Sequence, residues 1–194
     1  MRDEDAPMQS TASERHAGAV APGASAGNNA PPEERVTIAL VLHAEHDTDG
    51  SLSLQGSIQA GLVADALADR GLRAVLACDT PSCRGTAEPI AAKHHEIVLE
   101  NFDAPAVDAA LRRRLAELHR AYAGGEIVLV TDDTLLERIV GALDELPPQE
   151  RTVPPVAPAS ITRLRLRADL SYSVSINNTE HLDDVTGSDR FRML

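Results

Sequence analysis

Two histidines and a glutamate follow an apolar segment near the start of the chain. The stretch LVLHAEHDTDG, residues 40–50, places His43, Glu45 and His46 after a run of aliphatic residues typical of a buried strand. An imidazole changes charge near pH 7, so it can accept a proton, attack an electrophile or bind a metal. The pattern indicates a candidate site at the end of a strand. The alternative readings are an inert histidine at that end and a solvated His46.

Two further segments with polar side chains leave expected strands. They are CDTPSCRGTAEPIA at 78–91 and VTDDT at 130–134, which contains Asp132 and Asp133. In open α/β sheets, ligands bind beyond the carboxyl ends of the strands, so we expect the three segments to meet at one edge. Asp132 and Asp133 are also good helix N-caps, because a carboxylate accepts the unpaired backbone N–H groups of a first turn.

The elements that position these residues alternate along the sequence. Strands are expected at 36–43, 73–77, 96–100 and 126–131, with helices over 52–71, 81–95, 107–122 and 133–146 between or after them. Segments 160–167 and 172–177 alternate with period two and predict an antiparallel hairpin. The fold class is therefore α/β, a three-layer αβα sandwich whose mostly parallel sheet has an antiparallel C-terminal edge hairpin.

The helices carry more detailed expectations. Ile58, Leu62 and Leu67 should form the apolar stripe of the first helix, which should end at Gly71. Thr80 should cap the second helix, and Pro89 could shorten or kink it. The third helix should bury one face and close at the glycine pair 124–125; its face residues are Val107, Leu111, Leu115, Leu118 and Tyr122.

Composition divides the chain and excludes some functions. Residues 1–34 are rich in Ala, Gly, Pro and acids and predict a disordered tail, whereas 35–194 form the expected domain. A net charge of −12 and an aromatic content of 2% argue against nucleic-acid or anionic-membrane binding. We find neither an apolar run of membrane-spanning length nor a secretory signal in the sequence, so we expect a cytoplasmic protein.

Three sequence motifs carry a resemblance to a known family. Leu52, Ser53, Gly56, Gln59 and Ala60 form the first, TAEPIA at 86–91 the second, and NNTEHL at 177–182 the third. In this order and spacing they resemble the histidine phosphatase superfamily, in particular the small phosphoglycerate-mutase-like phosphatases of bacteria. The resemblance covers about residues 36–182. It implies the phosphoglycerate-mutase-like fold, often dimeric, with His43 in the place of the nucleophile and Glu100 in that of the proton donor.

The active-site motifs depart from the family pattern. Leu42 and Ala44 stand where the family has an arginine and a glycine around its histidine. Ser82 takes the place of the second arginine, and Arg84 lies two residues further on, which turns it about 200° around a helix. Asp132 replaces the second histidine. The resemblance thus implies a member with degraded catalytic motifs, in which a doubly charged phosphate would meet neutral or negative groups.

Three functions remain open on this evidence. The favoured one is a small-molecule pocket in which His43 performs acid/base or nucleophilic chemistry on a non-phosphorylated substrate. The second is a catalytically silent pseudophosphatase used for binding or regulation, and the third is a weak phosphomonoesterase or mutase with an atypical site. No cofactor is expected, and no recognised ligand spacing supports a metal. The catalytic candidates are His43, Glu100 and Asp132, and the pocket candidates are Leu42, Glu45, His46, Ser82, Arg84 and Asp133.

Overall fold

The computed structural model describes residues 34–151 and 153–183. The expected tail therefore lies outside the described residues except for its last position, as does the end of the expected domain. The described chain forms ten main elements: β1 (Arg35–Leu42), α1 (Leu54–Leu67), β2 (Leu72–Ala77), α2 (Pro81–Ala92), β3 (Leu99–Asn101), α3 (Asp108–Tyr122), β4 (Glu126–Thr131), α4 (Asp133–Leu143), β5 (Ile161–Arg167) and β6 (Tyr172–Asn178). Two short 3-10 helices, Pro148–Glu150 and Glu180–Leu182, follow α4 and β6 respectively.

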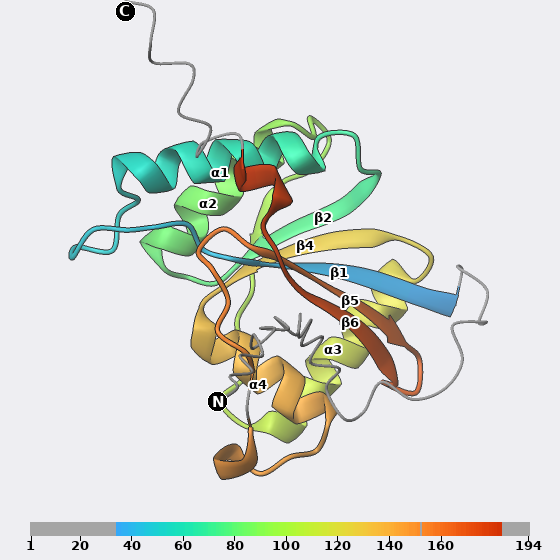
Figure 1. The fold of residues 1–194 in the computed structure, drawn as a ribbon. Coiled ribbons are helices and arrows are strands. Elements are labelled where there is room, and N and C mark those ends of the chain that lie inside the picture. Colours follow the sequence, from blue (N-terminus) through green and yellow to red (C-terminus); the bar gives the residue numbers. More distant parts are fainter. Residues whose placement is uncertain (1–33, 152, 184–194) are drawn as a thin grey trace, which may run out of the picture.

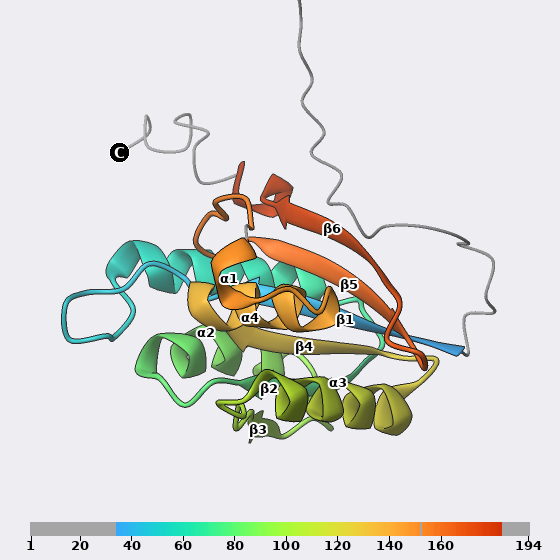
Figure 2. The ribbon, with the colours of Figure 1, turned by 90° about the horizontal axis from the view of Figure 1, so that it is seen from below.

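One six-stranded sheet forms the middle layer, in the order β3-β2-β4-β1-β5-β6. Strands β1 to β4 are parallel to one another, whereas β5 is antiparallel to β1 and β6 is antiparallel to β5. Helices α1 and α2 cover one face, and α3 and α4 cover the other (Figure 1). The expected αβα sandwich with an antiparallel C-terminal hairpin is confirmed. Seen from below, β6 forms the sheet edge and β5 lies inside it (Figure 2).

The central strands are buried on both faces because helices pack on each side. Residues Ile38–Val41 of β1 and Ile127–Val130 of β4 are at most 1% exposed. Their register pairs Leu42 with Thr131, so both strands end level with each other. The loops β1–α1, β2–α2, β3–α3 and β4–α4 consequently leave the sheet at the same edge.

The expected apolar stripe of α1 was wrong in part. Leu67 is buried, but Ile58 is 45% exposed and Leu62 is only partly buried. The buried face carries small residues, including Gly56 and Ala60, because α1 packs closely against α2 and the loop after β1. The helix also ends at Leu67, before Gly71.

Other helix boundaries follow local chemistry. The side chain of Thr80 caps α2 by accepting a hydrogen bond from the backbone N–H of Cys83, as expected. The helix continues past Pro89 to Ala92, so the proline does not shorten it. In α3, Leu111, Leu115 and Leu118 are buried, and Tyr122 is partly buried. Val107 precedes the helix and is 65% exposed, contrary to expectation.

Candidate functional site

His43 lies directly after β1, half-buried at the carboxyl edge of the parallel strands. Its backbone N–H donates to the carbonyl of Thr131 at 2.9 Å, which ties it to the end of β4. The ring Nδ1 lies 3.0 Å from the carbonyl oxygen of Ala44. Because a carbonyl oxygen only accepts, Nδ1 carries the hydrogen, and Nε2 has the lone pair when the ring is neutral. His43 is thus arranged to use Nε2 as a base or nucleophile.

The residue after His43 is anchored by a chain of buried hydrogen bonds. The backbone N–H of Ala44 donates to Thr86 Oγ1 at 3.0 Å, and the Thr86 hydroxyl donates to the carbonyl of Ser82 at 2.8 Å. Thr86 is fully buried and Ser82 is 6% exposed. Ser82, predicted to line the pocket, therefore supports the His43 loop through its backbone. Leu42, the other buried pocket candidate, is 4% exposed at the end of β1.

Glu45 and His46 follow His43 in the β1–α1 loop and are exposed. Gln59 of α1 clamps Glu45: its Oε1 accepts from the Glu45 backbone N–H at 2.9 Å, and its Nε2 donates to the Glu45 carboxylate at 3.0 Å. The ring of His46 lies 4.9 Å from that of His43, tilted by 60°. Gly56 makes this packing possible, because a Cβ at that position would lie 1.8 Å from the Glu45 carbonyl oxygen.

Asp132 begins α4 at the end of the strand next to β1. Its carboxylate accepts from the backbone N–H of Leu135 at 2.7 Å, so it is an N-cap, as one of the two readings expected. Asp132 also lines a cavity of about 290 Å³. Asp133 is exposed and lines a different hollow, between α4 and the segment 153–156. The two adjacent acids therefore face different surroundings.

Three residues around Asp132 were missed by the sequence reasoning. Asn101, Asp103 and Arg138 line the same cavity, together with Cys78. Glu100 is exposed on the short strand β3, and the cavity is lined instead by the four residues that follow it, 101–104. Their position directly after an expected strand was a usable signal, whereas nothing local in the sequence connects Arg138 with Asp132.

Arg138 is tied to the β3–α3 connection. Its Nη2 donates to the carbonyl of Pro105, and its Nε lies 3.6 Å from the Asp108 carboxylate. Asp108 also pairs with Arg151, and these two arginines hold the pKa of its carboxyl below the usual value, the Arg151 hydrogen bond being the largest cause. Arg138 therefore interacts with Pro105 and Asp108 rather than with Asp132.

Arg84 is paired on the surface. Its Nε donates to Asp79 Oδ1 at 3.0 Å, and the two side chains are 46% and 73% exposed. The pair lines an open hollow of about 710 Å³ between the β1–α1 loop and α2. An exposed pair of this kind contributes at most about 1 kcal/mol, so it holds Arg84 only weakly.

Cys78 and Cys83 are buried free thiols at the β2–α2 junction and belong to the core. A hydrogen bond between them lowers the pKa of the Cys78 thiol and raises that of the Cys83 thiol. Among the described residues, no three His, Cys, Asp or Glu side chains gather as a metal-ligand group. His181 donates through Nε2 to the Ala159 carbonyl at 2.9 Å.

Comparisons with known proteins give a consistent fold. A mycobacterial hydrolase has a TM-score of 0.62 and 19% identity over 75% of this chain and 99% of its own. The phosphoserine phosphatase of Entamoeba histolytica, in complex with 3-phosphoglyceric acid, gives 0.62 and 16% over 76% and 99%. The fold is that of the phosphoglycerate-mutase-like histidine phosphatases.

A third structure extends the comparison within this fold. It is a mycobacterial glucosyl-3-phosphoglycerate phosphatase in complex with inorganic phosphate, with a TM-score of 0.62 and 20% identity over 76% of this chain and 98% of its own. No protein-family profile and no curated protein match the sequence. In the described part of the chain, no helix is long and apolar enough to cross a membrane. At these identities the comparisons establish the histidine phosphatase fold and leave the chemistry to the residues.

Proposed function

We propose that His43 acts as a base or nucleophile on a small organic molecule whose reacting centre carries no phosphate. The observation that carries this proposal is the bond from Nδ1 of His43 to the Ala44 carbonyl at 3.0 Å, which leaves Nε2 for chemistry. Asp132, at the end of the adjacent strand, supplies a negative charge to stabilise a positive imidazolium or a cationic centre. Glu45 and His46 form the rim of the pocket.

The charges near His43 argue against a phosphate as the reacting group. Transfer of a phosphoryl group depends on cations that hold its equatorial oxygens. Ser82 stands at one position where the resemblance implies an arginine, and Arg84 is paired with Asp79. Losing one such donor typically costs about a hundredfold or more in rate. The same site accepts a neutral ester, amide or amine without that cost.

A weak phosphomonoesterase is the second candidate, and Arg84 is the observation that favours it. Its surface pair with Asp79 is easily broken, so the guanidinium can move at small cost. Two of the fold neighbours named above are phosphatases, one in complex with 3-phosphoglyceric acid and the other with inorganic phosphate. Under this alternative, phosphate binding recruits Arg84 to the histidine.

Two parallel assays on the full chain test the proposal. p-Nitrophenyl acetate reports attack by an accessible imidazole on a neutral carbonyl, and p-nitrophenyl phosphate reports phosphomonoester hydrolysis. We expect the unmodified chain to hydrolyse p-nitrophenyl acetate, and His43→Ala to lower that rate by about a hundredfold. The unmodified chain and His43→Ala should hydrolyse p-nitrophenyl phosphate at the same rate. His95→Ala is the matched control, because His95 is an exposed histidine beyond the end of α2.

The outcomes separate the three functions. Phosphate turnover that is lost in both His43→Ala and Arg84→Gln would overturn the proposal in favour of the phosphatase. If His43→Ala and His95→Ala reduce acetate turnover equally, or if neither ester is turned over, the proposal also fails and the silent scaffold remains. Binding of a non-phosphorylated metabolite that protects His43 from acylation would supply the substrate class.

A further inference from the structure

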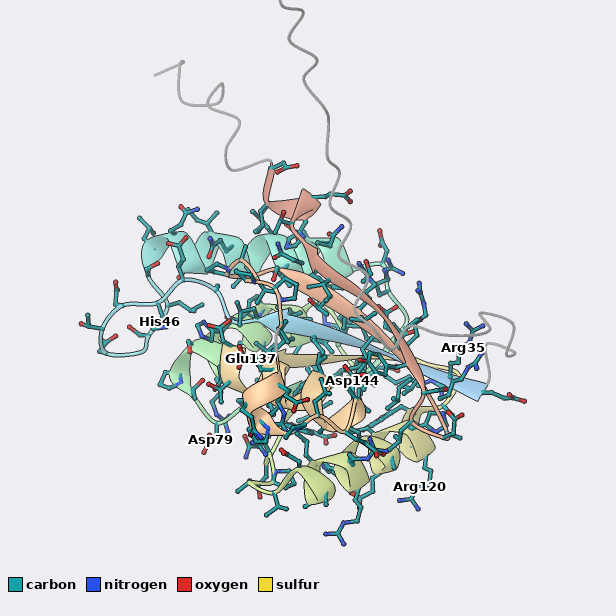
Figure 3. The ribbon with its side chains drawn as sticks, turned by 60° about the horizontal axis from the view of Figure 1, so that its bottom comes forward. Arg35, His46, Asp79, Arg120, Glu137 and Asp144 are labelled. Atoms are coloured by element: carbon teal, nitrogen blue, oxygen red, sulfur yellow. The ribbon has the colours of Figure 1, made fainter. Side chains whose placement is uncertain are left out.

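Several arginines lie on one face of the sheet at the amino end of the parallel strands, opposite the end that carries His43. Arg163, Arg165 and Arg167 alternate along β5 with Leu164 and Leu166, which are fully buried against the other layer. The register places Arg165 beside Thr37 of β1, and Thr37 beside Glu126 of β4. Paired positions share a face of a sheet, so arginine, threonine and glutamate side chains form one row. Arg35 lies at this end of β1, far from His46 and Asp79 (Figure 3).

A cavity of about 450 Å³ opens at this end. Its lining includes Arg35, Arg73, Arg165, Thr37 and Glu126, together with the backbone of nearby glycines. Three arginines face one glutamate there, although the whole chain has a net charge of −12. The cavity is therefore a local concentration of positive charge in an acidic protein, and it has the size of a metabolite site.

The single carboxylate of this cavity is already shared by arginines at its border. Glu126 Oε2 lies 3.7 Å from Arg70 Nη1, and Glu126 Oε1 lies 3.9 Å from Arg163 Nε. Both distances exceed a hydrogen bond, and the buried Oε1 and Nε atoms have no hydrogen-bond partner among the described residues. Glu126 thus offsets Arg70 and Arg163 and leaves Arg73 and Arg165 for another anion.

Arg73 and Arg165 provide the unsatisfied donors. Within residues 34–151 and 153–183, neither guanidinium has a carboxylate at ion-pair distance, and Arg73 donates only to the Ala123 carbonyl, at 3.5 Å. Gly125 preserves the position of Arg73, because a Cβ at that residue would lie 2.6 Å from its Cδ and Nε. Guanidinium forks match the planar or tetrahedral oxygens of carboxylates and phosphates.

We propose that this cavity, which we call the arginine cavity, binds a small molecule bearing phosphate or carboxylate groups. A long polyanion is disfavoured by the acidic remainder of the surface, whereas a compact anion can enter the cavity alone. β1 separates the arginine cavity from His43 by eight residues, or about 25 Å at the usual rise of a strand. The site is therefore distinct from the His43 pocket and does not depend on the function proposed for that pocket.

Calorimetric titration of the full chain tests the proposal. Pyrophosphate and citrate are the two probes, because they distinguish phosphate from carboxylate sources of the same charge chemistry. We expect saturable binding of one equivalent of at least one probe, weakened about tenfold in Arg165→Gln and in Arg73→Gln. Arg120→Gln is the matched control, because this exposed arginine of α3 bonds only to its own helix. His43→Ala should bind the probes as tightly as the unmodified chain.

Melting curves of the variants accompany the titration, since both substituted arginines are exposed and should leave the fold intact. Absence of saturable binding by both probes would overturn the proposal. The proposal also fails if Arg120→Gln weakens binding as much as Arg165→Gln, because the attraction would then be non-specific. Binding that is lost only in His43→Ala would assign the anion to the other end of the sheet and contradict the arginine cavity.

Discussion

The two ends of the parallel sheet have opposite chemistry. At the carboxyl end, His43 lies against the ring of His46, Asp132 caps the helix that follows the neighbouring strand, and Arg84, the sequence candidate for a phosphate-binding cation, is paired with Asp79. At the amino end, arginines of β1, β2 and β5 line a cavity with one carboxylate. The cations that phosphate chemistry requires are thus concentrated where the fold has no catalytic histidine. Two proteins with the same fold can therefore differ in function, because the fold determines where the loops meet and the side chains of those loops determine what is bound.

The largest expected effect tests how tightly the carboxyl end is packed. In Gly56→Ala the new Cβ would lie 1.8 Å from the Glu45 carbonyl oxygen, so the loop carrying His43 must move. We expect a loss of about 3 kcal/mol in the free energy of unfolding, measured by urea denaturation. Gly61→Ala, in the same helix with nothing within 4 Å, is the control and should gain up to about 1 kcal/mol. Equal effects of the two changes would contradict a close packing of α1 on this loop.

Two substitutions of Asp132, at the carboxyl end of the sheet, distinguish the effect of its capping hydrogen bond from that of its negative charge. Asp132→Ala removes the bond to the Leu135 backbone N–H and should cost about 1 kcal/mol of stability. Asp132→Asn keeps a capping oxygen and should leave the unfolding free energy nearly unchanged, while removing the negative charge beside His43. Thermal and urea unfolding of the two variants provide the measurement. A loss in Asp132→Asn as large as in Asp132→Ala would show that the charge, and not the cap, stabilises α4.

Glu126 provides the corresponding test at the amino end. Glu126→Gln removes the one carboxylate that the described residues contribute to the arginine cavity, and it removes the charge shared with Arg70 and Arg163. We expect pyrophosphate to bind about threefold to tenfold more tightly, since a like charge has been removed from the lining. Glu117→Gln is the control, because Glu117 pairs with Arg114 on the surface of α3. Unchanged or weaker binding in Glu126→Gln would show that the anion does not sense this carboxylate.

Local sequence signals predicted the features at the carboxyl end of the parallel strands better than those at the amino end. Thr80 and Asp132 cap helices through bonds to residues three positions later, so their roles are visible in the sequence. Strands β1, β2 and β4 were equally visible, because buried parallel strands are continuous apolar runs. The strand expected at 96–100 was misplaced, since β3 covers only Leu99–Asn101. These features placed His43 and Asp132 after strand ends at one edge of the sheet, and the structure makes the two strands neighbours.

Features that depend on distant residues were not predictable in this way. The arginine cavity requires β5 to insert beside β1 in a register that sets Arg165 against Thr37, and alternation within β5 alone does not reveal this. The buried face of α1 was mistaken because close packing selects small residues such as Gly56, whereas the sequence reasoning followed large ones such as Ile58. Tertiary packing overrode the hydrophobic pattern at these positions.

The smallest effect concerns pH and should appear at only one end of the sheet. Burial, the largest cause, lowers the pKa of His181; its bond to the Ala159 carbonyl and the charge of Asp183 oppose that shift, and Arg163 adds to it. The folded state therefore holds fewer protons than the unfolded state at mildly acidic pH. This contribution to stability is complete above the unfolded pKa of about 6.5 and is lost as the pH falls through the lowered folded value.

Ala159 connects His181 with the end of β1, so the loss of stability at low pH should be measurable beside His43. Ala159 donates its N–H to the carbonyls of Leu42 and His43, at 3.1 and 3.3 Å. Because burial disfavours the charged ring, a protonated His181 should move toward water, release the Ala159 carbonyl and loosen that contact. We expect the protection factor of the Ala159 amide to fall between pH 7.5 and 5.5, measured by hydrogen exchange. His181→Gln should abolish the fall, whereas His95→Gln should preserve it. The amide of Gly124, bonded to the Arg35 carbonyl beside the arginine cavity, should keep its protection throughout. If both amides lose protection together, the two ends of the sheet open as one unit and are not independently stabilised.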